Sequence, residues 1–124
     1  MTTLPEWPGK EICMTLCDLT DKTCKPCEGG VKPLTREEAE AAMSQVDGWV
    51  LSEDGSMISR TFHFRDFYQT MAFINAMAWI ANSEDHHPDF SAGYNTCEVG
   101  FMTHAIGGLS ENDFICAAKI NALL

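Results

Sequence analysis

The 124-residue chain has few positive charges: eight lysine and arginine residues face eighteen acidic ones, for a net charge of −10. After Arg65, Lys119 is the single basic residue, whereas seven residues are acidic. Nucleic-acid phosphates and anionic membrane surfaces both attract clustered lysine and arginine. The composition therefore argues against nucleic acid and against a membrane surface as partners.

The sequence also has no recognisable targeting or membrane-spanning segment. Residues 1–8 lack the basic start and the apolar stretch of a signal peptide. The most apolar run, residues 67–81, contains three polar residues and is too short to cross a bilayer. Phosphate-binding glycine loops and the Gly-x-Ser-x-Gly nucleophile motif are missing too. We therefore expect a cytoplasmic protein whose cysteines are thiols or metal ligands.

Residues 1–33 differ in composition from the rest of the chain. They hold four of the five prolines and four of the six cysteines, with no periodic apolar pattern. We expect an irregular arm over 1–33 and a folded domain over 34–124. The arm contains a Cys-x-x-Cys pair, which is half of a common zinc site; free thiols or a disulfide within that pair are the alternatives. The four possible zinc ligands are Cys13, Cys17, Cys24 and Cys27.

From Thr35 onward, capping residues and apolar spacing predict the order α-β-β-α-β-β-α. Thr35 and Glu38 form a capping box, Asp54-Gly55 marks a hairpin turn, and Asp66 can cap the second helix. The expected elements are a helix over 35–46, strands over 49–52 and 57–64, a helix after 66, strands over 90–94 and 96–104, and a helix from 110.

This order predicts an α+β fold, a two-layer sandwich. The strands come in two pairs with short connections, which favours a four-stranded antiparallel sheet with three helices on one face. In the second helix we expect a buried seam, and further apolar residues outside it indicate that the helix is central or contacts another subunit. The expected seam consists of Phe67, Met71, Ile74 and Ala78.

Three of the four histidines are expected to lie close together. His86 and His87 precede Pro88, which favours a loop, and the following hairpin brings the end of its second strand, with His104, beside that loop. Histidine exchanges protons near neutral pH because its ordinary pKa is about 6.5. The cluster thus suggests acid–base catalysis. A metal is the alternative, although the helical His-x-x-x-His pair is absent, and we expect none here.

The remaining cysteines and the fourth histidine carry simpler expectations. Cys97 lies on the apolar face of its strand and Cys116 in the apolar last helix, so both are expected to be buried and inert. His63 stands between two phenylalanines on a strand, and we interpret it as structural or partly exposed.

His86-His87-Pro88 is followed by Tyr94, His104 and Asp113, with five, nine and eight residues between successive members. This joint spacing resembles the signature of the pterin-4a-carbinolamine dehydratase family. Residues 62–67 and 108–111 also look like the family, and residues 24–30 look like a leader found in some bacterial members. One departure is Asn82, where the family often has an acidic residue.

The resemblance implies the fold already predicted and an activity. The activity is dehydration of 4a-hydroxytetrahydropterin to quinonoid dihydropterin without a metal or an organic cofactor, which regenerates the pterin that aromatic amino acid hydroxylases use. A functional link to phenylalanine hydroxylase follows. By position the catalytic residues are His86, His87 and His104, with proton exchange at His104 and His86 and substrate binding at His87. The residues expected around the pterin are Asp85, Pro88, Thr103 and Asp113. Asp113 could orient a histidine or pair with the pterin amino and ring N–H groups.

Two other functions stay open on the sequence. Animal members of the family also bind a transcription factor and stabilise its dimer, so a non-catalytic binding module is the alternative to an enzyme. A metal-dependent hydrolase is the third interpretation. For the dehydratase and for the binding module we expect a homodimer or a homotetramer.

Overall fold

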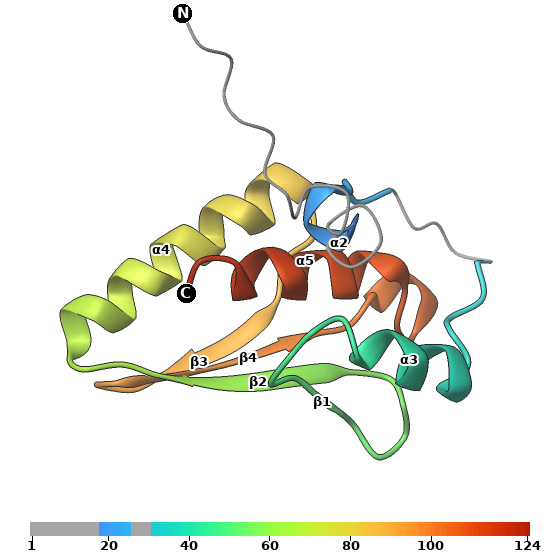
Figure 1. Ribbon diagram of the computed structural model, residues 1–124, viewed down its shortest axis with the longest axis horizontal. Helices are drawn as coiled ribbons and strands as arrows, with labels where there is room; N and C mark the ends of the chain where they lie inside the picture. The colour runs from blue at the N-terminus through green and yellow to red at the C-terminus, as the bar shows by residue number, and fades with distance from the viewer. Residues whose placement is uncertain (1–17, 26–30) are drawn as a thin grey trace, which may run out of the picture.

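The computed structural model describes residues 18–25 and 31–124. It confirms the α+β fold: a four-stranded antiparallel sheet carries the helices on one face (Figure 1). The strands are β1 (Val50–Leu51), β2 (Ile58–His63), β3 (Asp89–Ala92) and β4 (Thr96–Phe101). The helices are α2 (Asp18–Asp21), α3 (Arg36–Met43), α4 (Phe67–Glu84) and α5 (Glu111–Asn121), with a 3-10 helix, η1 (His104–Ile106).

The strand order, β1-β2-β4-β3, determines where a site can form. In the β3–β4 hairpin Asp89 is paired with Gly100, so the start of β3 lies beside the end of β4. The chain enters β3 from the C-terminal end of α4 and leaves β4 toward η1 and α5. Four segments therefore meet at this edge of the sheet, and three of the histidines lie on them.

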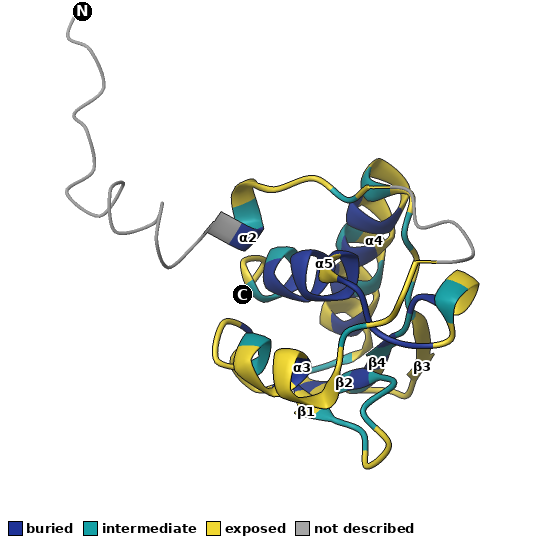
Figure 2. Ribbon diagram, turned by 90° about the vertical axis from the view of Figure 1, so that its right-hand side faces the viewer, coloured by how far each residue is buried: buried dark blue, intermediate teal, exposed yellow. Residues whose placement is uncertain are grey.

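The core lies between the sheet and the helices, and α5 is its most buried helix (Figure 2). Alternation along the strands turns Ile58 and Phe62 of β2 and Val99 and Phe101 of β4 toward the helices. Almost every residue of α5 from Asn112 to Ile120 is buried as well. The residues at the start of α5 are thus held rigidly against the sheet, next to the histidines.

The buried face of α4 differs from the expected seam. The buried residues are Thr70, Phe73, Met77, Ile80 and Ala81. Phe67, Met71 and Ala78 are exposed, and of the expected seam only Ile74 packs against the core. The expectation was wrong because apolar residues occur on every side of this helix, so its periodicity favours no one face. The predicted start is confirmed: the Asp66 side chain accepts the Gln69 N–H at 2.9 Å.

Several predicted ends were also wrong. The first helix ends at Met43, and Val46 is buried in the turn that follows. The last strand ends at Phe101, short of His104, because the chain turns back and Thr103 pairs with Gly108 in an isolated bridge. Gly107 permits this turn with a φ of 67°. His104 consequently begins η1 instead of ending a strand.

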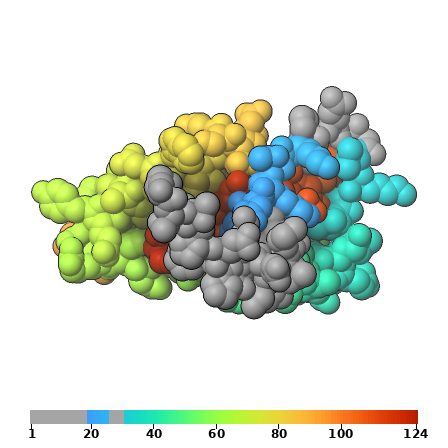
Figure 3. All heavy atoms as spheres, turned by 45° about the horizontal axis from the view of Figure 1, so that its top comes forward, coloured from blue at the N-terminus to red at the C-terminus, as the bar shows by residue number. Residues whose placement is uncertain are grey.

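Residues 18–25 pack against the helices although the sequence placed them in an irregular arm. The helix α2 buries Leu19 in the core, and Figure 3 shows this segment lying against α5. The Cys24 N–H donates to Glu84 Oε1 at 2.8 Å, and the Lys25 N–H donates to Asn112 Oδ1 at 3.0 Å. The segment is therefore attached to the end of α4 and to the start of α5. Among the described residues, no helix is both long and apolar enough to cross a membrane.

The contacts of the Glu84 carboxylate with Cys24 and Lys119 predict that the free energy of unfolding depends on pH. Burial alone would raise the pKa of the Glu84 carboxyl, but the Cys24 N–H and the Lys119 ammonium at 3.2 Å together lower the pKa below its ordinary 4.5. The carboxylate therefore stabilises the fold fully above pH 4.5, and this contribution is lost as pH falls through the lowered pKa. We expect Glu84→Gln to cost about 1.5–3 kcal/mol of unfolding free energy at neutral pH.

Denaturant unfolding at neutral pH and near pH 3.5 measures this difference. Glu40→Gln is the matched control, because Glu40 pairs with Arg36 on the exposed face of α3 and should change stability by less than about 0.5 kcal/mol. An equal loss for Glu84→Gln at both pH values would contradict the electrostatic origin.

Candidate active site

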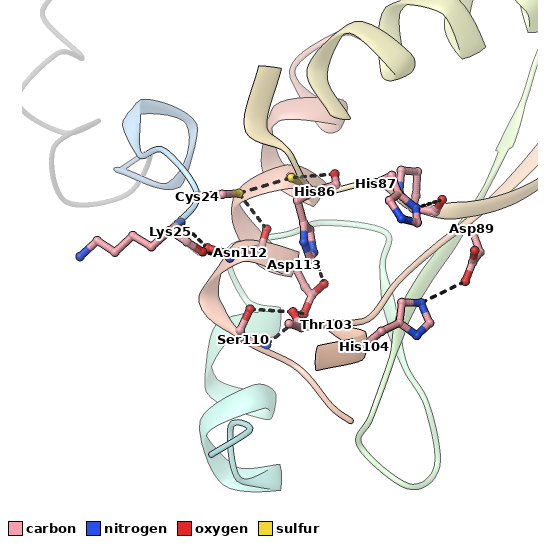
Figure 4. A network of polar contacts seen from close by, with 12 residues as sticks. Cys24, Lys25, His86, His87, Asp89, Thr103, His104, Ser110, Asn112 and Asp113 are labelled. Atoms are coloured by element: carbon pink, nitrogen blue, oxygen red, sulfur yellow. Dashed lines mark hydrogen bonds and ion pairs between the residues drawn. The ribbon is translucent and has the colours of Figure 1, made fainter. Parts of the chain in front are cut away.

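A pocket of about 370 Å³ opens at the sheet edge where α4, β4, η1 and α5 meet. His86, His87 and His104 all line it, as do Asp85 and Thr103. The hairpin thus brings together the histidines that the sequence singled out, although His104 reaches the pocket from η1. Figure 4 shows the three rings in this region, with His86 turned toward α5.

The shortest contact made by a histidine ring of the pocket joins His86 to Asp113. His86 Nε2 lies 2.6 Å from Asp113 Oδ1, and the Asp113 side chain has no exposed surface. A carboxylate accepts hydrogen bonds, so Nε2 carries the proton in this contact. In a neutral ring Nδ1 is then the nitrogen that can take up a proton. The contact fixes both the orientation and the tautomer of His86.

Asp113 is itself held by two further donors. Its Oδ2 accepts the Thr103 hydroxyl at 2.8 Å and the Ser110 N–H at 2.9 Å. The Thr103 and Ser110 hydroxyls also contact each other at 2.8 Å. Because Ser110 caps α5 and Thr103 follows β4, this buried carboxylate ties the helix start to the strand end. Such a network offsets the desolvation of a buried carboxylate.

The local backbone and an aromatic ring complete the setting of His86. Asp85 ends α4 in the left-handed conformation with a φ of 51°, which turns the chain sharply before His86. Aspartate tolerates this conformation better than most residues because its short polar side chain bonds locally. The imidazole then stacks on Phe101, with the ring centroids 5.8 Å apart and the planes 9° apart.

His87 and His104 are more open to solvent than His86. The His104 side chain is 63 % exposed, and its Nε2 lies 3.6 Å from Asp89 Oδ2. His87 is exposed, with Nδ1 at 3.4 Å from the Pro88 carbonyl oxygen. The pocket thus combines one fixed imidazole with two that can adjust to a bound molecule. This arrangement suits proton transfer at two points of a small polar ligand.

Two of the predicted contact residues do not line the pocket. Pro88 lies outside its lining, and Asp113 lies behind His86, fully buried. Glu84 lines the pocket and binds Cys24 and Lys119, while Asn82 is exposed on the last turn of α4.

Sequence reasoning missed several residues of the pocket wall. These are Cys24, Lys25, Met102, Ala105 and Asn112. The sequence could have indicated Asn112, because it is adjacent to Asp113 at the start of the predicted last helix. Cys24 and Lys25 had no such indication, because only the tertiary structure brings residues from the N-terminal segment to the histidines.

The zinc prediction concerns residues that lie mostly outside the described part of the chain. Cys13, Cys17 and Cys27 belong to residues 1–17 and 26–30, and the zinc site stays a prediction. Within residues 18–25 and 31–124, no three His, Cys, Asp or Glu side chains are grouped as metal ligands. Cys97 and Cys116 are buried, as expected.

Comparisons with known proteins identify relatives of this chain. A Nitrosomonas eutropha protein named as a candidate pterin-4-alpha-carbinolamine dehydratase is 62 % identical over 88 % of this chain and 96 % of its own. A Legionella pneumophila protein (strain Corby) with the same name is 54 % identical over 86 % of this chain and 96 % of its own.

Two solved structures share the fold. A Brucella melitensis protein described as a transcriptional coactivator/pterin dehydratase matches with a TM-score of 0.71 and 35 % identity over 74 % of this chain and 98 % of its own. A pterin dehydratase-like protein identified as a RuBisCO assembly factor in the alpha-carboxysome has a TM-score of 0.54 over 61 % of this chain and 88 % of its own. At 23 % identity, this second likeness concerns the fold alone.

The model of the family described as pterin 4 alpha carbinolamine dehydratase matches residues 32–123, a range that contains all three histidines and Asp113. Together with the identities above, this match shows that the chain belongs to the pterin 4 alpha carbinolamine dehydratase family.

Proposed function

We propose that the protein dehydrates 4a-hydroxytetrahydropterin to quinonoid dihydropterin by acid–base catalysis. The observation that carries the proposal is the convergence of His86, His87 and His104 on one pocket, with His86 fixed by a buried carboxylate. Family membership supports the substrate class. The reaction requires a proton for the leaving C4a hydroxyl and the removal of a proton from N5, and both steps suit imidazole.

The proposed roles follow from how each ring is held. His104 and His86 exchange protons with the substrate, and His87 binds and orients it. Asp113 is a positioning residue, because it touches His86 and has no surface toward the pocket. Asp85 and Thr103 line the pocket and are proposed to contact the pterin, with Pro88 shaping the loop. The described residues thus supply acid–base groups for the whole reaction.

We further propose a place for this step in the cell. Quinonoid dihydropterin is the form from which a reductase regenerates the tetrahydropterin that aromatic amino acid hydroxylases consume, so a functional link to phenylalanine hydroxylase follows. The working unit is the domain over residues 34–124 in the cytoplasm, and from the N-terminal segment Cys24 and Lys25 line its pocket.

Alanine replacement of the histidines tests the catalytic proposal. We expect His104→Ala and His86→Ala to lower kcat about 10²–10⁴-fold, since each removes a proton-transfer group. His87→Ala should mainly raise KM. His63→Ala is the matched control, because His63 is exposed at the end of β2 and does not line the pocket.

Stopped-flow measurement of 4a-hydroxytetrahydropterin dehydration gives kcat and KM separately for each variant. A folded wild-type protein that does not accelerate the reaction would refute the proposal. A pure KM effect at His104 would refute the assignment of its role.

Asp113→Asn tests the positioning role. The amide cannot accept as many hydrogen bonds as the carboxylate, so the tautomer and orientation of His86 are no longer fixed. We expect kcat to fall at least about tenfold and the pH dependence of kcat to shift, with a small change in KM. Glu111→Gln, an exposed residue two positions earlier, is the control. A variant with wild-type kcat and pH profile would show that Asp113 is structural only.

The outer face of α4 supports self-association. Tyr68, Met71 and Trp79 follow one another at helical spacing and are 88 %, 36 % and 72 % exposed. Exposed aromatic residues of this kind typically mark an interface. We propose that α4 joins copies of the chain into a homodimer or a homotetramer.

Sedimentation analysis of Trp79→Ser with Met71→Ser checks this interface. The double variant should shift toward smaller species, whereas Val31→Ser, which removes an exposed apolar residue outside the helices, should behave as wild type. An unchanged assembly would exclude this face of α4.

A non-catalytic binding module is the second candidate function. The Brucella melitensis relative, described as both a coactivator and a pterin dehydratase, and the exposed face of α4 favour it. A folded His86→Ala/His104→Ala double variant that still recovers a specific protein partner would support this function.

A further inference from the structure

Two cysteines from distant parts of the sequence meet beside the pocket. Cys24 Sγ lies 3.6 Å from Cys116 Sγ, although 92 positions separate the residues in the chain. Cys24 is partly exposed and lines the pocket, while Cys116 is fully buried in α5. The dehydration chemistry proposed above uses neither thiol.

The approach of these thiols results from the anchoring of residues 22–25. On one side the Cys24 N–H donates to Glu84, and on the other the Lys25 N–H donates to the Asn112 side chain. The Asn112 amide donates back to the Lys25 carbonyl, so this residue pair is bonded in both directions. Lys22 also forms an ion pair with Glu111 at 3.3 Å. The segment thus lies along the start of α5, with Cys24 and Lys25 beside Asn112 (Figure 4). In this position the Cys24 sulfur is in contact with the Cys116 sulfur.

We propose that Cys24 and Cys116 form a reversible disulfide that fastens residues 22–25 to α5 beside His86. A disulfide requires the two sulfur atoms at about 2.05 Å, so they must approach by about 1.5 Å. Cys24 lies outside any helix or strand, so we expect its side chain and segment to make this small adjustment.

The two thiols have different roles in the reaction. A hydrogen bond with Cys24, together with burial, raises the pKa of the Cys116 thiol, so Cys116 keeps its proton at neutral pH. The partly exposed Cys24 is the thiol that a small disulfide can reach. In the first step the Cys24 thiolate displaces one glutathione thiolate from glutathione disulfide and forms a mixed disulfide.

In the second step Cys116 attacks the Cys24 sulfur, loses its proton to the released thiolate or to water, and expels the second glutathione. The protein loses two hydrogen atoms, and one glutathione disulfide becomes two molecules of glutathione. Excess glutathione reverses both steps. Reversible, redox-sensing bonds are the kind found in reducing compartments.

Oxidation would act on the pocket through two contacts. The Cys116 thiol lies 3.8 Å from the His86 carbonyl oxygen, and the disulfide removes this S–H donor. The wall formed by Cys24 and Lys25, held by hydrogen bonds in the reduced protein, becomes covalently attached. The Cys24–Cys116 disulfide would therefore make the surroundings of His86, the residue bonded to Asp113, depend on the redox state of the solution.

The test equilibrates the reduced full-length protein with glutathione and glutathione disulfide at graded ratios, then blocks free thiols by alkylation. Digestion combines trypsin with a glutamate-specific protease. Trypsin separates Cys13 and Cys17 from Cys24 by cleavage after Lys22, and the second protease is needed because no lysine or arginine separates Cys97 from Cys116, whereas Glu98 and Glu111 do. We expect a peptide pair joined through Cys24 and Cys116, in wild type and in Cys27→Ser alike. Cys97→Ala is the matched control and should leave this pair unchanged.

Two measurements that do not depend on dehydratase activity report whether the Cys24–Cys116 disulfide has formed. Oxidation should raise the melting temperature of wild type and Cys27→Ser, because the cross-link closes a long loop. Oxidation should also shift the His86 ring signals in NMR spectra. Cys116→Ala and Cys24→Ser should show neither effect. If Cys116→Ala does not fold, Cys24→Ser still provides this control, because Cys24 is only partly buried.

The proposal fails if Cys24 of the folded wild type is recovered joined to Cys27. It fails equally if Cys24 of Cys27→Ser carries only glutathione while Cys116 stays reduced at every glutathione ratio.

Discussion

The buried carboxylate of Asp113 is the contact on which the site depends. It accepts hydrogen bonds from His86, Thr103 and the Ser110 backbone, which come from the end of α4, the end of β4 and the cap of α5. A carboxylate without exposed surface is stable only when its oxygens are paired. The Asp113 oxygens are paired only when all three segments meet. The same pairing fixes the orientation of His86.

The fold supplies the rigidity that this contact requires. α5 is buried along almost its whole length, so its first turn cannot move away from the sheet without exposing the core. The β3–β4 hairpin holds the loop of His86 and His87 near η1, which carries His104. The two exposed histidines of the pocket, His87 and His104, lie on short segments at the edge of this rigid unit. A fixed imidazole beside two exposed ones is an arrangement that suits proton exchange with a bound ligand.

The N-terminal segment supplies part of the pocket wall. Cys24 and Lys25 are attached to α4 and α5 through Glu84 and Asn112, and both form part of the pocket wall. The same attachment directs Cys24 toward Cys116. One set of backbone hydrogen bonds thus shapes the pocket and aligns two thiols, which connects the proposed dehydration with the proposed redox response through shared residues.

The sequence by itself determined the order of the α-helices and strands from Thr35 onward, the α+β class and the grouping of three histidines. Capping residues, apolar alternation and motif spacing are local signals, which a sequence shows directly. Asp66 capped α4 as expected, and the histidine spacing indicated the family that residues 32–123 match. The tertiary structure alone decided which face of α4 is buried, since this helix is apolar on all sides. It also decided that Asp113 lies behind His86 and that Cys24 meets Cys116, because contacts between distant residues depend on packing and leave no local pattern.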